Sequence, residues 1–164
     1  MTAGRRVGID VGGTKCLGVV LDPHGSIIAE HRLPTPKGPD AIIATLAEIA
    51  RTLGPYDSLG VGVPGLVTRD GVLSAAPNLV DISNFRVGEL LGAELGHVVH
   101  VDNDATCAAI AEWRLGAARG FDDVLVVTIG TGIGAGAIAN GRVMRGAHGF
   151  AGEFGHMVVV RDGP

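Results

Sequence analysis

Two glycine-rich segments, each beside an expected strand, could bind the phosphates of a nucleotide. They cover residues 10–15 and 128–136. Glycine lets the backbone turn tightly and aim successive N–H groups at an anion. Each segment alone could be an ordinary turn. The presence of one in each half of the chain instead favours two opposed hairpins that hold a single polyphosphate.

The first segment adds side chains that suit a nucleotide. Lys15 would place a positive charge, and Thr14 a hydroxyl, next to Gly12 and Gly13. Asp10, at the end of a strand, could hold Mg²⁺ through water because this ion keeps part of its hydration shell. The alternative is a glycine hairpin with an exposed lysine. A Walker A loop is not expected, since its spacing of glycine and lysine is absent.

The second segment does not predict a dinucleotide-binding fingerprint. Gly130, Thr131 and Gly132 match its start, but the fingerprint requires a helix next. Asn140 and Gly141 follow instead, the dipeptide typical of a two-residue β-hairpin. We therefore expect a strand, a glycine-rich turn and a second strand, as in the first segment.

Two clusters of polar side chains could bind a hydroxylated substrate. Asp104 opens an expected helix, where it could cap the helix or accept the proton of a substrate hydroxyl. The helix N-terminus would keep its carboxylate ionised. Glu153 and His156 lie in a glycine-rich loop and are good hydrogen-bond acceptors for sugar hydroxyls. His156 alone could equally be structural or a metal ligand.

The expected elements predict an α/β protein. Three tightly joined strands come first, as in an antiparallel meander, and helices then alternate with strands. The strands are expected at residues 7–10, 16–21, 26–32, 58–63, 97–101, 123–129, 134–139, 142–143 and 156–160, and the helices at 40–53, 87–95 and 105–115. Residues 64–86 are expected to form a long loop.

This order of elements is that of the ribonuclease-H-like domain, with a mixed sheet. In the actin-like ATPase and hexokinase superfamily the domain occurs twice, and nucleotide binds in the cleft between the copies. We place one such domain at residues 1–117 and the start of an incomplete second one at 118–164. The small residues 116–120 are the candidate hinge.

The composition narrows the class of protein. The net charge is −4 and no block of Lys and Arg occurs, which argues against nucleic acid as a partner. Cys16 and Cys107 lie apart in apolar stretches, so we expect reduced core residues and a cytoplasmic protein. No apolar run is long enough to span a membrane, and the polar first residues predict no signal peptide.

Six motifs of this sequence, taken in order, resemble the ROK family of repressors and sugar kinases, and the actinobacterial-type glucokinases in particular. The resemblance covers essentially the whole chain. The motifs are residues 10–15, 62–65, 76–79, 103–105, 128–134 and 152–156.

The resemblance implies an ATP- and Mg²⁺-dependent hexose kinase that converts glucose to glucose 6-phosphate. Asp104 would be the catalytic base that activates the sugar 6-hydroxyl. The sugar would be bound by Gly65, Asn78, Asn103, Glu153 and His156. The ATP phosphates would lie against Gly12, Gly13, Thr14, Lys15, Thr131 and Gly132, with Asp10 close to the metal. A homo-oligomer, dimer or tetramer, is expected for a full-length protein.

One departure from the family pattern concerns zinc. In the family, the histidine that corresponds to His156 also ligates a structural Zn²⁺ together with three cysteines just downstream. The sequence ends at Pro164 before such a segment, and Cys16 and Cys107 cannot replace it. We therefore expect the chain to be truncated, with zinc binding only in a full-length protein and catalysis in doubt without it.

Three alternatives to a glucokinase remain open from the sequence. The first is a ROK kinase for fructose, mannose or N-acetylmannosamine, with ATP or polyphosphate as the phosphate donor. The second is a sugar-sensing ROK regulator, although the first strand begins too near Met1 for a helix-turn-helix domain to precede it. The third is a non-catalytic ATP-binding module, which the same fold also serves.

Overall fold

The computed structural model describes residues 4–76, 79, 82–130 and 132–161. The contacts divide the chain into two compact units, Met1–Asp104 and Ala105–Pro164, each of which is described by itself. The helix that follows Asp104 therefore groups with the second unit, whereas we placed it at the end of the first domain. The two ribonuclease-H-like domains, with a boundary at 117/118, stay a prediction.

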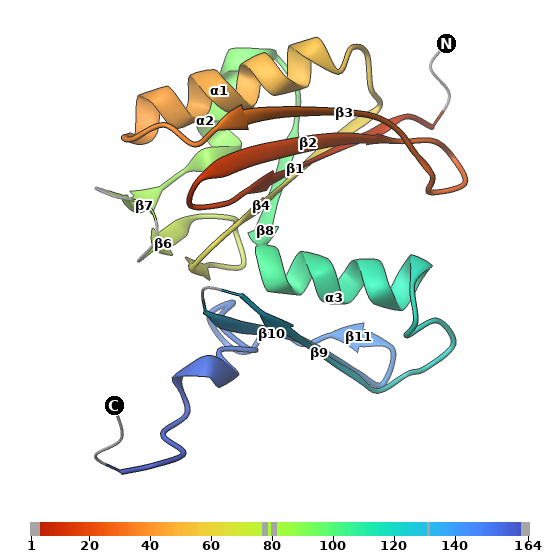
Figure 1. The fold of residues 1–164 in the computed structure, drawn as a ribbon, viewed down its shortest axis with the longest axis vertical. Coiled ribbons are helices and arrows are strands. Elements are labelled where there is room, and N and C mark those ends of the chain that lie inside the picture. The colour runs from red at the N-terminus through yellow and green to blue at the C-terminus, as the bar shows by residue number, and fades with distance from the viewer. Residues whose placement is uncertain (1–3, 77–78, 80–81, 131, 162–164) are drawn as a thin grey trace. The chain divides into compact units, whose positions relative to one another are not determined.

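The first unit is built on a five-stranded mixed sheet (Figure 1). Its strands lie in the order β3-β2-β1-β4-β8, with β1, β2 and β3 antiparallel and β4 and β8 parallel to β1. The elements are β1 (Arg6–Val11), β2 (Lys15–Leu21), β3 (Ile27–Pro34), α1 (Pro39–Thr52), β4 (Ser58–Val63), α2 (Val87–Leu95) and β8 (Val99–Asn103). The predicted fold class, α/β with a mixed sheet, is confirmed.

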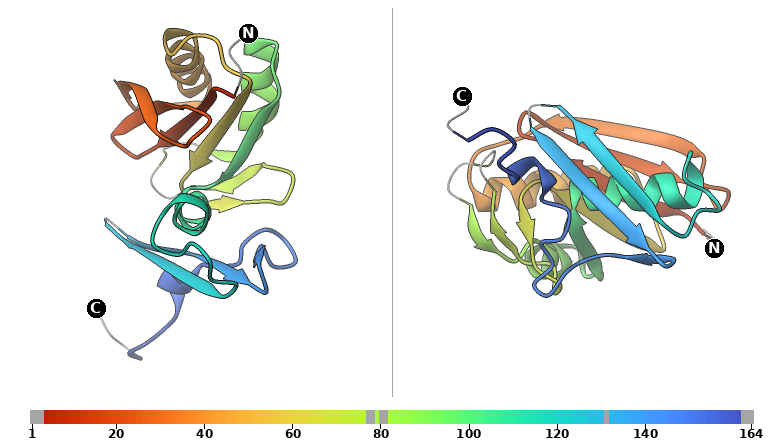
Figure 2. Two further views of the ribbon diagram at one scale, coloured as in Figure 1. Left: turned by 90° about the vertical axis from the view of Figure 1, so that its right-hand side faces the viewer. Right: turned by 90° about the horizontal axis from the view of Figure 1, so that it is seen from below.

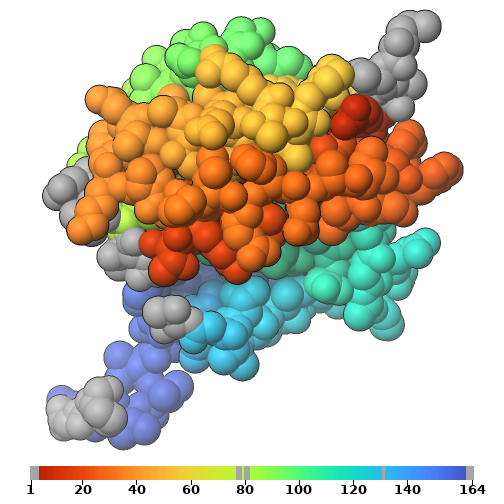
Figure 3. Space-filling view, turned by 45° about the horizontal axis from the view of Figure 1, so that its top comes forward, coloured from red at the N-terminus to blue at the C-terminus, as the bar shows by residue number. Residues whose placement is uncertain are grey.

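Helices α1 and α2 lie side by side along one face of this sheet (Figures 1 and 2). Alternate residues of β1 are buried, and α1 buries Leu46 and Ile49 completely. Each such side chain contributes roughly 1.5–3 kcal/mol by leaving water. Gly18 of β2 lets α1 come close, because a Cβ there would overlap the Cγ2 atom of Ile49. From outside, the atoms of α1 and β3 close over this core (Figure 3).

The expected loop at residues 64–86 is partly wrong. It contains a small antiparallel sheet of three short strands in the order β5-β6-β7. These are β5 (Leu66–Val67), β6 (Leu73–Ala75) and β7 (Ser83–Phe85). Leu73 pairs with Phe85, and both side chains are buried. Strands of two and three residues are too short to show an alternating pattern in the sequence.

The second unit contains α3 from Ala105 onward and a three-stranded antiparallel sheet. Its elements are α3 (Asp104–Leu115), β9 (Val124–Ile129), β10 (Ile133–Ala139), β11 (Arg142–Val143) and the 3₁₀ helix η1 (Phe154–His156). The predicted hairpin is confirmed, because Asn140 and Gly141 adopt φ of 50° and 67°, as in a type I′ turn. Gly136 of β10 lets α3 approach, since a Cβ there would lie 2.6 Å from the Cβ of Ala109.

One further expectation is contradicted, and one stays a prediction. The strand predicted at residues 156–160 is wrong: His156 ends η1, and Val159 is 87% exposed. An apolar run becomes a strand only when another strand pairs with it, and no described strand does so. The expected hinge at 116–120 folds back on α3, where the Ala117 N–H donates to Glu112 Oε2 at 2.9 Å. No described helix is both long and apolar enough to cross a membrane.

Candidate functional site

The carboxyl ends of β1, β4 and β8 meet at one edge of the first unit's sheet. Asp10 lies opposite Gly62 in the strand register, and Gly62 lies opposite Asp102. Ligands of open α/β sheets bind outside the carboxyl ends of parallel strands. The fold thus brings Asp10 to the same edge as Asn103, the last residue of β8. Two of the predicted site residues of this unit thus share one location.

Asp104 is the first residue of α3 and lies directly after β8. Its carboxylate is half-buried, and its Oδ1 atom accepts a hydrogen bond of 3.1 Å from Asn103 Nδ2. The same amide nitrogen donates to the Gly65 carbonyl at 3.1 Å, after the end of β4. Asn103 therefore fixes the Asp104 carboxylate relative to two strands. The partial positive charge of the helix N-terminus favours its ionised form.

Gly65 is required by space as well as by conformation. Its φ is 101°, a value that residues other than glycine rarely adopt, and an added Cβ would overlap the carbonyl oxygen of Ala75. This glycine places its carbonyl where Asn103 can donate to it. Asn78, the other residue predicted for this wall of the sugar site, lies outside the described residues.

The charge of Asp104 affects the pKa of Asp10. Asp10 is exposed overall, but partial desolvation of its carboxylate raises its pKa above the ordinary value, the negative charge of Asp104 raises it further, and Lys15 opposes both. The described residues contain no group of three or more His, Cys, Asp or Glu that could hold a metal. Asp10 alone could still serve Mg²⁺, which takes one or two carboxylates and completes its shell with water and phosphate oxygens.

The predicted phosphate turn joins β1 to β2. The Gly12 N–H donates to the Lys15 carbonyl at 2.9 Å, which closes the turn. Gly13, Thr14 and Lys15 are exposed to solvent. Thr35, just after β3, reaches across β2: its hydroxyl donates to the Gly12 carbonyl at 2.6 Å. Its N–H donates to the Thr14 carbonyl at 3.1 Å.

Sequence reasoning missed Thr35. Only the run Pro34, Thr35 and Pro36 could have signalled it, because two prolines fix the backbone on either side of one polar residue.

The second unit holds the other predicted residues. The Gly130 N–H donates to the Gly132 carbonyl at 2.9 Å, and Gly132 is exposed to solvent. Thr131 lies outside the described residues. Glu153 and His156 are brought together, with 3.6 Å between Oε2 and Nε2. The role of His156 as a zinc ligand stays a prediction.

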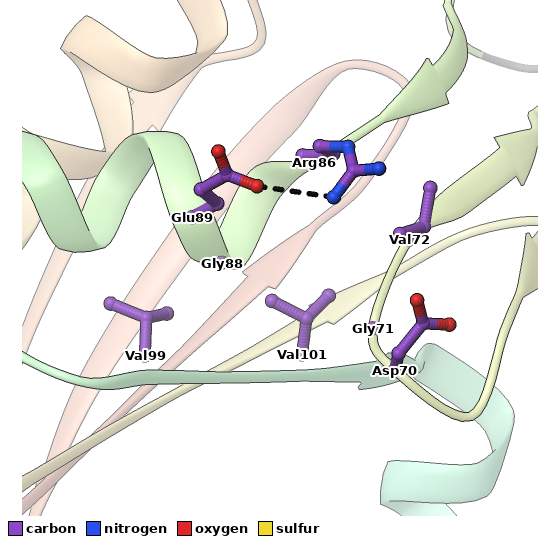
Figure 4. Close-up of a pocket in the computed structure, with 8 residues that line it drawn as sticks. All are labelled: Asp70, Gly71, Val72, Arg86, Gly88, Glu89, Val99 and Val101. Carbon is purple, nitrogen blue, oxygen red and sulfur yellow. Dashed lines mark hydrogen bonds and ion pairs between the residues drawn. The ribbon is translucent and has the colours of Figure 1, made fainter.

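One small hollow in the first unit is separate from these residues. It is lined by Asp70, Gly71, Val72, Arg86, Gly88, Glu89, Val99 and Val101, and its volume is about 80 Å³ (Figure 4). Arg86 and Glu89 form an ion pair of 3.2 Å beside it. Sites for small molecules measure about 300–1,000 Å³. This hollow is too small for a sugar or a nucleotide.

Comparison with known proteins identifies the family. The sequence profile of the ROK family matches residues 6–164. The chain belongs to the ROK family. A glucokinase of Streptomyces coelicolor is 39% identical over 98% of this chain and 51% of its own length. A β-glucoside kinase of Listeria monocytogenes is also 39% identical, over 94% of this chain and 53% of its own length.

A solved structure shows the same fold. The ROK family glucokinase of Streptomyces griseus, in complex with glucose and AMPPNP, matches with a TM-score of 0.91. It is 35% identical, and the match covers 98% of this chain and 52% of that one. This ROK chain thus spans about half the length of the relatives it matches.

Proposed function

We propose that this ROK protein transfers the γ-phosphate of ATP to a hexose, with glucose as the substrate and its 6-hydroxyl as the acceptor. The observation that carries the proposal is the placement of Asp104. Asp104 is the first residue of α3, at the edge of the sheet where the carboxyl ends of the parallel strands meet. Its carboxylate accepts a hydrogen bond of 3.1 Å from the Asn103 side chain. The glucose and AMPPNP in the related Streptomyces griseus glucokinase support both substrates.

Asp104 would orient the sugar hydroxyl and accept its proton late in the transfer. A carboxylate in this position mainly positions the nucleophile, because the transition state of phosphoryl transfer is loose. The Asn103 amide prevents Asp104 from rotating away. We propose that the sugar is bound by Gly65, Asn78, Asn103, Glu153 and His156.

The phosphates would be bound mainly by backbone N–H groups. We propose that ATP lies against Gly12, Gly13, Thr14, Lys15, Thr131 and Gly132. Mg²⁺, near Asp10, would neutralise charge on the phosphate oxygens. Lys15, on the turn between β1 and β2, would also neutralise charge on the phosphate oxygens.

A kinase for a related sugar is the second candidate. The β-glucoside kinase of Listeria monocytogenes matches this chain as well as the glucokinase of Streptomyces coelicolor does, at 39% identity. The choice between them depends on which sugar is phosphorylated with the highest kcat/KM. Glucose, a β-glucoside, fructose, mannose and N-acetylmannosamine would be compared with the same purified chain.

The test of the proposed base is Asp104→Asn. Asparagine keeps the Oδ1 atom that accepts from Asn103, so the local hydrogen bond remains while the base is removed. We expect sugar-dependent consumption of ATP to fall roughly 10²- to 10⁴-fold, with glucose binding by calorimetry retained.

The matched control is Asp102→Asn. Asp102 Oδ1 accepts from the Asn103 N–H at 3.0 Å, and asparagine can keep this bond. Turnover should survive this change. Normal turnover in Asp104→Asn would remove Asp104 from the role of base.

A further inference from the structure

We propose that Thr35 is a positioning residue for the phosphate-binding turn at residues 12–15, and that its hydroxyl aims the Gly13 N–H at the nucleotide. The inference rests on the proposed function, since it names what prepares the turn for ATP. Thr35 is 23 residues from Gly12 in the sequence, yet it donates hydrogen bonds to the carbonyls of both Gly12 and Thr14.

The local sequence fixes Thr35 before any ligand binds. Pro34 and Pro36 each have a restricted φ, and Pro36 also keeps Thr35 in an extended conformation. Neither proline has an N–H. Thr35 is therefore the one residue of this tripeptide whose backbone can donate a hydrogen bond, and it donates to the Thr14 carbonyl at 3.1 Å.

The hydroxyl of Thr35 determines which way one peptide group of the turn faces. In a trans peptide, the carbonyl and the N–H of the next residue point in opposite directions. Thr35 Oγ1 donates to the Gly12 carbonyl at 2.6 Å, so the Gly13 N–H points away from Thr35. Gly13 is exposed, and no described residue accepts a hydrogen bond from its N–H.

A buried contact supports the side chain of Thr35. Cys16 is fully buried, and its Sγ atom lies 3.5 Å from Thr35 Oγ1. The hydroxyl thus lies between a core residue and the Gly12 carbonyl. In such a half-buried place, losing the hydroxyl leaves a carbonyl without its donor, which costs more than a hydrogen bond exposed to water.

The test compares Thr35→Val with Thr35→Ser in the full chain. Valine keeps the shape and the backbone N–H but loses the hydroxyl, whereas serine keeps both donors. We expect the dissociation constant of Mg²⁺-ATP, measured by calorimetry, to rise roughly 5- to 30-fold in Thr35→Val and to return close to wild type in Thr35→Ser. The KM for ATP should rise with it, while the KM for the sugar stays constant.

Amide hydrogen exchange of the ligand-free chain gives a second readout. Amides of residues 12–15 should exchange faster in Thr35→Val than in Thr35→Ser, with no change in α1. Suppose that the wild-type chain binds ATP and that Thr35→Val matches it in both ATP affinity and amide hydrogen exchange. This result would overturn the positioning role and leave the proposed function intact. A wild-type chain that binds neither ATP nor sugar would overturn the proposed function, and this inference with it.

Discussion

The hydrogen bond between Asn103 and Asp104 can be measured directly by a double-mutant cycle. The variants are Asn103→Ala, Asp104→Ala and the double substitution. A hydrogen bond to a charged group is worth roughly 1.5–3 kcal/mol when buried. Both side chains are half-buried, and solvent reduces the value, so we expect a coupling of about 1–2 kcal/mol.

Urea unfolding of the four proteins at pH 7 gives this coupling. Asn103→Ala also removes the hydrogen bond to the Gly65 carbonyl, but it does so whether residue 104 is aspartate or alanine. The cycle therefore cancels that loss and leaves the pairwise energy. Arg51 and Glu94 serve as the matched control, because their 2.7 Å ion pair is exposed and should couple by roughly 0.2–1 kcal/mol.

A coupling within about 0.5 kcal/mol of zero for Asn103 and Asp104 would refute this reasoning. It would mean that Asp104 is placed by the start of α3 alone. Asn103→Ala should then change stability through its bond to the Gly65 carbonyl, and by the same amount with aspartate or alanine at position 104.

Two further predictions concern the same edge of the sheet. Partial desolvation and the charge of Asp104 raise the pKa of Asp10 in the folded protein. The contribution of Asp10 to the free energy of unfolding should therefore fall as the pH rises from the pKa of Asp10 in the unfolded state to its pKa in the folded state. In metal-free urea titrations at several pH values, Asp10→Asn should lose this dependence and be more stable than wild type at pH 7; the opposite order would contradict the assignment. Gly65→Ala should cost about 2–4 kcal/mol, because φ is 101° and the Cβ meets backbone, whereas Gly54→Ala, with φ of 83° and open space, should cost only about 1–2 kcal/mol in the same assay. Equal losses at Gly65 and Gly54 would show that the approach of β6 does not restrict Gly65.

The sequence predicted the sheet of the first unit better than the elements around it. Long strands such as β1 and helices such as α1 carry periodic apolar patterns, because one face of each is buried. The small sheet β5-β6-β7 has no such pattern, since its strands of two and three residues are too short to show one. The run at 157–160 shows the opposite error. Its composition is typical of a strand, but composition cannot supply a partner strand.

The candidate site shows why some of its residues can be found from sequence and others cannot. Asp10 and Asp104 stand out because an ionisable residue at the end of an apolar strand needs a reason of its own. Thr35 does not stand out, because threonine is common in turns, and Gly65 was predicted only through the resemblance to the family. Their importance comes from what they touch: a carbonyl 23 residues away for Thr35, and the backbone of β6 for Gly65.

A related sequence can keep the reactive residues of this site and still lack the hydroxyl of residue 35. A chain that keeps Asp104 and the glycines of the phosphate turn but has valine at position 35 still shows the motifs of the family. Its turn would lack the bond that orients the Gly12 carbonyl, and under the proposed function we expect its affinity for ATP to be lower. The chemistry of such a site can be recognised from its reactive residues, but its strength depends on neutral residues that hold the backbone in place.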